Sequence, residues 1–119
     1  MAVVQKVINM KKPLNGIRVL DLTNVLAGPY CCHQLVHLGA EVIKVEAPKT
    51  GDLARPLGAD ERLNKKLMGI SFLAQNAGKK SITLNLKSPR GKKLFLQLTE
   101  TADVRVENFR PGVMKRLGL

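Results

Sequence analysis

A strand, a helix and a second strand within roughly 30 residues constrain this chain more than any other feature. The nearly continuous apolar run from Ile17 to Leu22 predicts a buried strand. The β-branched run from Val42 to Val45 predicts a second one. Between them, Pro29 suits the first position of a helix and Gly39 its end. Two strands joined through a helix pair in parallel, so this segment predicts a right-handed βαβ unit.

The same alternation returns in the second half of the chain. Residues 81–86 alternate apolar and polar side chains, which is the period of a strand. Ser88 and Pro89 then supply an N-cap and a first-turn proline for a helix. Residues 103–109 predict another strand, and a further helix is expected to start at residues 111–112. The whole pattern predicts an α/β fold with an open, mainly parallel sheet and flanking helices.

The connection between residues 47 and 80 is less regular. Pro48, Gly51, Pro56 and Gly58 indicate loop, and only residues 67–73 have the pattern of a short helix. A connection of this length is unusual inside a compact domain. It is either a functional excursion or a segment that packs on something outside this chain.

The net charge limits the classes of partner. The chain carries 20 Lys and Arg against 9 Asp and Glu, a net charge of +11, which suits nucleic acid, an acidic membrane or a polyphosphate cofactor. Aromatic residues make up only 3%, which argues against stacking surfaces for single-stranded nucleic acid. No apolar run approaches the length of a membrane span. A phosphate-bearing small molecule is therefore at least as good a partner as DNA.

Cysteine and histidine gather in one segment. The two cysteines, Cys31 and Cys32, are adjacent, a spacing that strains a disulfide, so we expect free thiols and a reducing, cytoplasmic setting. His33 and His37 lie one helical turn apart, a spacing that can bind a metal ion. The adjacent cysteines point in different directions, however, and no second ligand pair occurs. We therefore expect thiols in the core, histidines on the surface and no metal.

Motifs for other chemistry are weak. The turn at residues 23–29 and Glu46 occupy the positions of a pyrophosphate loop and a ribose-binding acid, but the G-x-G-x-x-G glycines are missing. This argues against an NAD or FAD site. No nucleophile elbow or P-loop occurs. Asp21, inside a predicted strand, is expected to anchor a turn or a helix end rather than to catalyse.

Residues 107–116 place a strand end directly before a helix start. Free backbone N–H groups at such a point favour an anion, and Arg110, Lys115 and Arg116 add positive charge. Three more cations flank the third predicted strand: Lys79, Lys80 and Lys87. These side chains either form one positive surface for an anion or are simply solvated.

Five blocks of sequence occur in a fixed order: PLNGIRVLDLT at 13–23, LAGP at 26–29, LGAEVIKVE at 38–46, KKSITLNLK at 79–87 and ADVRVENFRPGVM at 102–114. Together they resemble the family III CoA-transferases (CaiB/BaiF family), which include formyl-CoA and carnitine CoA-transferases and α-methylacyl-CoA racemase. The resemblance implies that residues 13–119 are the N-terminal part of a Rossmann-like domain. Residues 1–12 are expected to be a flexible extension.

The resemblance also implies an acyl-CoA enzyme and an interlocked homodimer of ring-shaped subunits. It implies coenzyme A contacts at five positions: Val25, Leu84, Asn108, Phe109 and Arg116. The family's catalytic aspartate would lie beyond Leu119, so no catalytic residue is assigned and these 119 residues alone are expected to be inactive. Ala47 and Leu26 stand where the formyl-CoA enzyme has an arginine and a glutamine, which argues against formyl or oxalate substrates.

The expected function is that of the CoA-binding N-terminal portion of an acyl-CoA:carboxylate CoA-transferase. Its partners would be a CoA thioester and a carboxylate acceptor, in a homodimer or with a complementing chain, without nucleic acid or membrane. The racemase branch is an alternative, although the longer segment at residues 51–78 favours a transferase. A small basic nucleic-acid-binding module is another, which explains the charge but not the ordered blocks.

Overall fold

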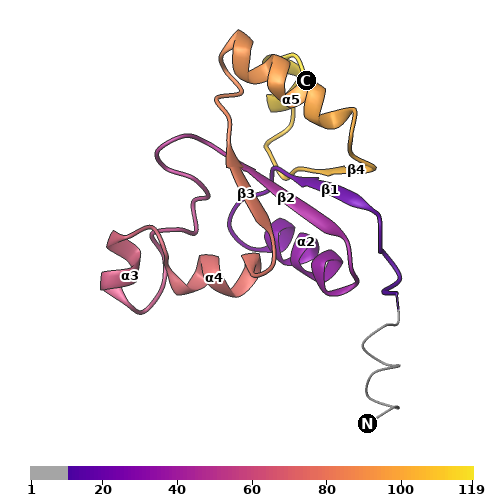
Figure 1. The fold of residues 1–119 in the computed structure, drawn as a ribbon. Coiled ribbons are helices and arrows are strands. Elements are labelled where there is room, and N and C mark those ends of the chain that lie inside the picture. The colour runs from indigo at the N-terminus through magenta and orange to yellow at the C-terminus, as the bar shows by residue number, and fades with distance from the viewer. Residues whose placement is uncertain (1–10) are drawn as a thin grey trace, which may run out of the picture.

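Four parallel strands form the centre of the molecule. The computed structural model describes residues 11–119, and its strands are β1 (Arg18–Asp21), β2 (Glu41–Glu46), β3 (Lys80–Thr83) and β4 (Val104–Val106). Their order in the sheet is β3-β2-β1-β4 (Figure 1). All three pairings are parallel, with Val19 of β1 beside Val42 of β2 and Val104 of β4. The α/β fold predicted from the sequence is confirmed. The extension predicted at residues 1–12 falls almost wholly outside the described residues.

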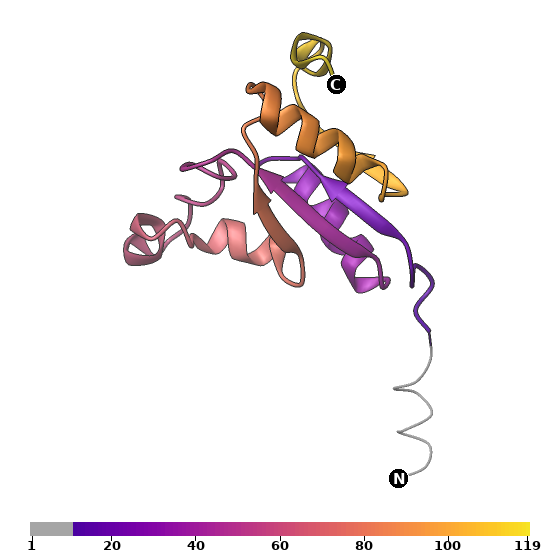
Figure 2. The same cartoon turned by 45° about the horizontal axis from the view of Figure 1, so that its top comes forward.

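Helices cover both faces of this sheet. Their bounds are α2 (Ala27–His37), α3 (Glu61–Lys65), α4 (Ile70–Asn76), α5 (Pro89–Thr99) and α6 (Val113–Leu117). α2 and α4 pack together on one face, and α5 crosses the opposite face (Figure 2). α3 projects to the side, away from the sheet (Figure 1). Within residues 11–119, no helix has the length and apolar character needed to cross a membrane.

The core consists of two clusters, because successive side chains of a strand point to opposite faces of a sheet. Val19 and Val42 pack with Cys32 of α2 on one face. Leu20 packs with Phe95 of α5 on the other. Phe95 is fully buried, and burial of a side chain of this size contributes about 3 kcal/mol. The two clusters hold the strands between α2 and α5.

α2 begins two residues before the proline that was expected to open it. Its first residue is Ala27, so Pro29 is the third residue of the helix. Proline is tolerated there because the first N–H groups of a helix have no intrahelical partner. The prediction of a helix was correct, and its start was wrong by two residues.

Two strands, β3 and β4, end three residues earlier than predicted. β3 ends at Thr83, although the alternation continued to Leu86. The Leu84 N–H still donates to the Glu46 carbonyl at 3.0 Å, but the chain then turns at Asn85, whose carbonyl accepts a hydrogen bond three residues on. Leu84 and Leu86 instead pack against the α5 cluster. β4 covers only Val104–Val106 of the predicted 103–109.

The irregular connection between β2 and β3 contains two short helices. α3 was not predicted. Asp60 caps it by accepting hydrogen bonds from the N–H groups of Arg62 and Leu63 at 2.9 and 3.3 Å. α4 lies three residues later than the predicted helix, and its Phe72 is buried. Because α4 packs on α2, part of this connection belongs to the fold of the chain itself.

The two cysteines differ in their environment. Cys32 is buried and Cys31 is exposed, and both are free. Neighbouring residues on a helix point about 100° apart, so only one of them can face the sheet. Burial, followed by the nearby Asp21 charge, raises the pKa of the Cys32 thiol to about 12. The prediction of core thiols was therefore correct for Cys32 and wrong for Cys31.

Candidate functional site

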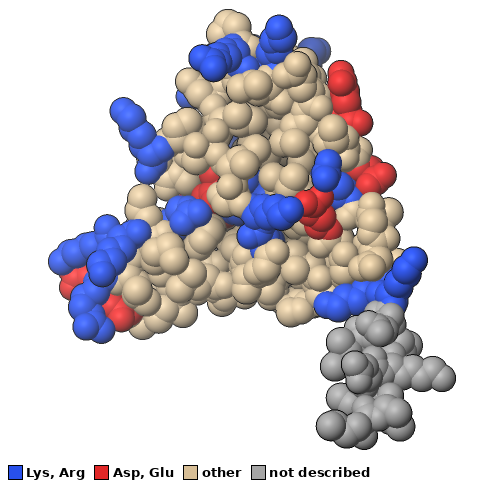
Figure 3. Space-filling view, viewed as in Figure 1, with Lys and Arg blue, Asp and Glu red and all other residues tan. Residues whose placement is uncertain are grey.

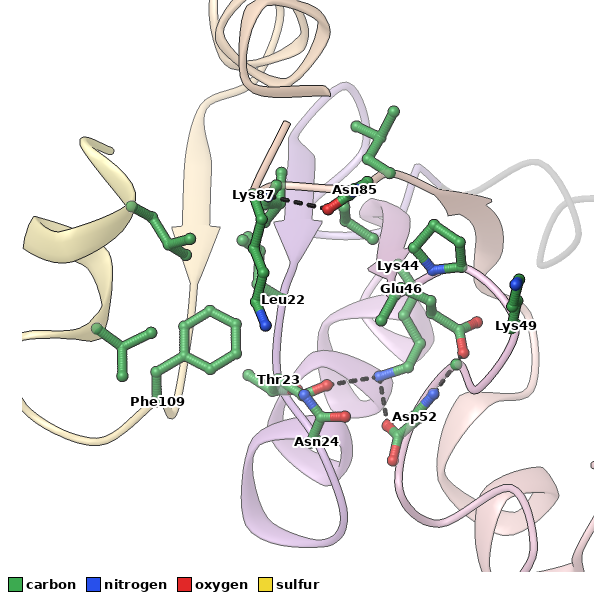
Figure 4. Close-up of a pocket in the computed structure, with 18 residues that line it drawn as sticks. Leu22, Thr23, Asn24, Lys44, Glu46, Lys49, Asp52, Asn85, Lys87 and Phe109 are labelled. Atoms are coloured by element: carbon green, nitrogen blue, oxygen red, sulfur yellow. Dashed lines mark hydrogen bonds and ion pairs between the residues drawn. The ribbon is translucent and has the colours of Figure 1, made fainter. Parts of the chain in front are cut away.

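A cavity opens at the carboxyl ends of the strands (Figure 4). Its volume is about 530 Å³, which is in the range of small-molecule sites. Residues that follow each strand line it, including Leu22–Asn24 after β1, Ala47 after β2, Leu84–Lys87 after β3 and Phe109 after β4. In open α/β sheets, ligands bind at this end, where the strand order reverses. The order reverses here between β1 and β4, so the cavity occupies the expected position for a ligand.

The cavity has an apolar side and a charged side (Figure 4). Phe109 and Leu117 belong to the apolar wall next to α6. Asp52 and Lys49 lie on the opposite side. Lys87 extends between the two sides in this view. Such an arrangement suits a ligand that has both an apolar part and negatively charged groups.

The predicted coenzyme contacts are divided between the wall and its surroundings. Leu84 and Phe109 line the cavity. Asn108 holds the neighbouring turn, because its side chain accepts a hydrogen bond from Asn24 N–H at 3.0 Å and donates one to the Asn24 carbonyl at 2.9 Å. Arg116 is exposed on α6 and does not line the cavity. The structure thus brings Leu84 and Phe109 into the cavity wall and leaves Asn108 and Arg116 outside it.

Val25, the fifth predicted contact, lies in the turn between β1 and α2 and has a left-handed backbone. Its φ is 73°, a conformation that costs a β-branched residue on the order of 1–3 kcal/mol. The Val25 N–H donates to Asp52 Oδ1 at 3.0 Å. With its amide nitrogen turned toward this segment, Gln75 donates to the carbonyls of Val25 and Leu26 at 2.8 and 3.0 Å. Side chains distant in sequence therefore hold the turn in a strained conformation.

Four charged side chains form a buried chain beneath this turn. Lys79 Nζ lies 2.7 Å from Asp21 Oδ2, and Lys44 Nζ lies 3.8 Å from the same oxygen and 2.7 Å from Asp52 Oδ2. Each of the four side chains is at most 1% exposed. Lys44 also donates to the Thr23 carbonyl at 2.8 Å. Two positive and two negative charges balance, which is what makes their burial possible.

The three lysines around β3 have three different roles. Lys79 is buried, and burial lowers its pKa although the Asp21 carboxylate opposes this effect. Lys80 pairs with Glu41 at 2.5 Å, at the amino end of the strand. Only Lys87 lines the cavity. Both interpretations are therefore wrong for Lys79. It is neither part of a shared positive surface nor solvated, because it pairs with Asp21 inside the protein.

Asp21 anchors a turn, as predicted. Its Oδ1 accepts hydrogen bonds from the backbone N–H and the hydroxyl of Thr23 at 2.9 and 2.5 Å. Its Oδ2 accepts one from Lys79 at 2.7 Å. Asp21 is fully buried and does not line the cavity, so it supports the turn from below.

Glu46, at the end of β2, is already engaged by protein groups. Its carboxylate accepts hydrogen bonds from Arg55 Nε and Nη2 at 2.6 Å each, from Ser81 Oγ at 2.6 Å and from Asp52 N–H at 2.8 Å. Burial alone would raise the pKa of Glu46, but the bonds from Arg55 and Ser81 outweigh it and lower the pKa to about 2. A ribose-binding role would need these oxygens to be free, which further disfavours an NAD site.

Asp52 is the residue at this site that the sequence did not reveal. It joins Lys44 to the N–H groups of Val25 and Ala54. The sequence signal was only a Gly-Asp pair in a loop, which indicates a turn. Nothing in that local pattern states which distant lysine the carboxylate meets.

Positive charge is spread over the surface rather than concentrated at the cavity. In Figure 3, Lys and Arg side chains gather over the α5–α6 end and over α3. The cations that line the cavity are Lys44, Lys49 and Lys87, of which Lys44 is buried. Within the described part of the chain, no group of three or more His, Cys, Asp or Glu side chains is placed to hold a metal ion.

Comparison with known proteins gives the same assignment over nearly the whole chain. The sequence model of "CoA-transferase family III" matches residues 14–119. A formyl-CoA:oxalate CoA-transferase of Afipia carboxidovorans is 47% identical over 109 residues, which are 92% of this chain and 25% of that protein. A succinyl-CoA:glutarate CoA-transferase of Mus musculus is 47% identical over 108 residues, 91% of this chain and 24% of that protein.

A solved structure agrees with these sequence matches. The crystal structure of Rv3272 from Mycobacterium tuberculosis, a protein described as a probable fatty acyl-CoA transferase, superimposes with a TM-score of 0.82 at 49% identity. The superposition covers 93% of this chain and 29% of that one. The chain therefore spans about a quarter of the length of the relatives it matches. On its sequence, its sheet topology and these matches, the chain belongs to CoA-transferase family III.

Proposed function

We propose that this chain forms the coenzyme A side of the active site in an acyl-CoA:carboxylate CoA-transferase. The observation that carries the proposal is the cavity at the carboxyl ends of all four strands, which Leu84 and Phe109 line together with Lys49 and Lys87. Coenzyme A has phosphate groups and a less polar arm. A cavity with an apolar wall and accessible lysines is suited to such a molecule.

The catalytic aspartate of the proposed reaction lies outside these residues. Asp52 and Glu46, the acids that line the cavity, are paired with Lys44 and Arg55, so neither is free to attack a thioester. Asp21, which lies beneath the turn, is paired with Lys79. In this proposal the 119 residues bind and orient the coenzyme. A further part of the polypeptide, or a second copy in a homodimer, supplies the nucleophile.

The acyl specificity is proposed to lie outside this portion as well. The relatives named above carry formyl and oxalate, fatty acyl, or succinyl and glutarate in their names, yet their identity to this chain is nearly the same. What the names share is CoA transfer. We therefore assign coenzyme A and a carboxylate acceptor as the ligand classes, without a particular acyl group.

Calorimetric titration of coenzyme A into the chain tests this proposal. We expect saturable binding that Lys87→Ala weakens about tenfold, because an ammonium group that contacts a phosphate contributes about 1.4 kcal/mol at this level of exposure. Arg116→Ala should have a smaller effect, since Arg116 lies outside the cavity wall. Lys93→Ala, on the exposed side of α5, is the matched control for loss of one positive charge.

Duplex DNA is the second ligand in the same experiment. A nucleic-acid module would bind DNA with a steep dependence on salt, and coenzyme A would not compete specifically. Folded chain that binds DNA but not coenzyme A would contradict the proposal. Equal losses in the Lys87 and Lys93 variants would show that only net charge matters and would contradict the assigned cavity.

A further inference from the structure

We propose that His33 and His37 form a two-histidine site for a divalent late transition-metal ion, Ni²⁺ or Cu²⁺, on the surface of α2. Neither histidine lines the cavity, so this site is separate from the one assigned to coenzyme A. The sequence had argued against a metal because no second pair of ligands accompanies these residues. The structure adds two observations that the spacing alone could not supply.

The first observation is the convergence of the two rings. Residues four apart on a helix lie on the same face, and here His33 Nε2 and His37 Nε2 are only 3.0 Å apart. The ring centroids are 4.3 Å apart, with 68° between the ring planes. His37 is exposed and His33 is half-buried, and rotation of the His37 ring within its broad χ2 well turns its Nε2 from His33 toward a shared ion.

The second observation fixes the ring tautomer of His33. Its Nδ1 lies 3.1 Å from the carbonyl oxygen of Ala77, in the segment between α4 and β3. A carbonyl oxygen only accepts hydrogen bonds, so in the neutral ring Nδ1 carries the proton and Nε2 keeps its lone pair. Metal-binding histidines are oriented by this same kind of contact from the other ring nitrogen to a backbone carbonyl.

The ligand type selects the kind of metal. The 3.0 Å between the two Nε2 atoms is the length of a hydrogen bond in the metal-free pair, and it changes when a ring rotates toward an ion. Imidazole nitrogen is a ligand that Ni²⁺ and Cu²⁺ favour, and two histidines leave the other positions of their square-planar and octahedral complexes open to water. Mg²⁺ and Ca²⁺ prefer oxygen ligands and are not expected to bind here.

Binding of the ion requires only a change of tautomer in one histidine. In the metal-free neutral pair, His37 donates its Nε2 proton to His33 Nε2. On binding, His37 changes tautomer so that its proton is on Nδ1, both Nε2 lone pairs bind the ion, and water fills the other coordination positions. No redox step is involved. The site is open and its metal is exchangeable.

Titration of Ni²⁺ into the 119-residue chain tests this proposal, and Ni²⁺ is the probe because Cu²⁺ would oxidise the exposed Cys31 thiol. We expect one Ni²⁺ per chain and a higher unfolding temperature with Ni²⁺. His33→Gln and His37→Gln should each weaken Ni²⁺ binding at least tenfold and abolish the thermal shift. Both positions are on the surface, and far-UV circular dichroism confirms that each variant is folded.

Cys31→Ser is the matched control, since the thiol lies on the same helix, and it should bind Ni²⁺ as the wild type does. Loss of binding in only one of the two histidine variants would mean a single ligand and would overturn the chelate. Binding retained in both histidine variants, or lost in Cys31→Ser, would overturn it as well.

Discussion

Glu46 keeps its negative charge in a place that is nearly closed to water. Its side chain is 2% exposed, and Arg55 and Ser81 hold both oxygens. A folded-state pKa of about 2 against an ordinary value of 4.5 means that the folded chain takes up its proton only in strong acid. The ionised carboxylate therefore stabilises the fold above about pH 4.5, and this stabilisation disappears as the pH falls toward 2.

Glu46→Gln should lower the free energy of unfolding at pH 7 by up to roughly 3 kcal/mol, the equivalent of the shift in pKa. The difference from wild type should narrow steadily between pH 4.5 and pH 2, because the wild type loses the same charge there. Urea unfolding of both proteins at a series of pH values measures this difference in the free energy of unfolding. The exposed Glu100, changed to Gln, is the control. A difference that stays constant with pH would show that shape, not charge, is what Glu46 contributes.

α5 is the element whose sequence signals were most complete. Ser88 was predicted as its N-cap, and Ser88 Oγ accepts a hydrogen bond from the Gly91 N–H at 3.0 Å. Phe95, in the middle of the helix, is fully buried. The close approach of Gly91 to the preceding turn was not predictable. A Cβ at this position would collide with the backbone carbonyl of Asn85.

The Gly91→Ala variant tests whether the collision with Asn85 costs more free energy than the higher helix propensity of alanine gains. Alanine is favoured over glycine inside a helix by about 1 kcal/mol, but the collision is with backbone and should cost more, so we expect a net destabilisation of about 2 kcal/mol. Thermal unfolding measures the change. Gln97→Ala, on the exposed face of α5, should be neutral or slightly stabilising. A stabilised Gly91→Ala variant would mean that the turn at Asn85 moves freely.

Across the whole molecule, the buried chain of Lys79, Asp21, Lys44 and Asp52 ties together segments up to 58 residues apart in sequence. Lys79→Met should destabilise the fold by about 3–5 kcal/mol, because the Asp21 carboxylate loses its nearest partner inside the protein. Adding Asp21→Asn should restore part of that loss by removing the charge. Chemical unfolding of the two single variants and the double variant measures the coupling. Strictly additive effects would show that the pair does not act together.

The predictable part of the site is the part that follows from the order of strands and helices. Parallel strands place their carboxyl ends at one edge of the sheet, so the edge that holds the cavity could be located in advance. Leu84 and Phe109, which line the cavity there, were named only through the resemblance. The roles of Lys79 and Asp52 could not be predicted. Their partners lie 58 and 8 residues away in the sequence, and ion pairs follow no periodic pattern that a sequence would reveal. Val25 was located through resemblance, but its left-handed backbone was not, since a valine gives no signal for that conformation.

The central position of β1 also bears on how the chain is made. While the polypeptide is being synthesised, β1 can pair with β2 once residue 46 has emerged, but its other edge must wait for β4 at Val104–Val106. That interval is about 60 residues, or roughly 3–12 seconds at ordinary rates of translation. For that time a nascent chain presents an unpaired, apolar strand edge, which can pair with the same edge of a nascent chain on a neighbouring ribosome.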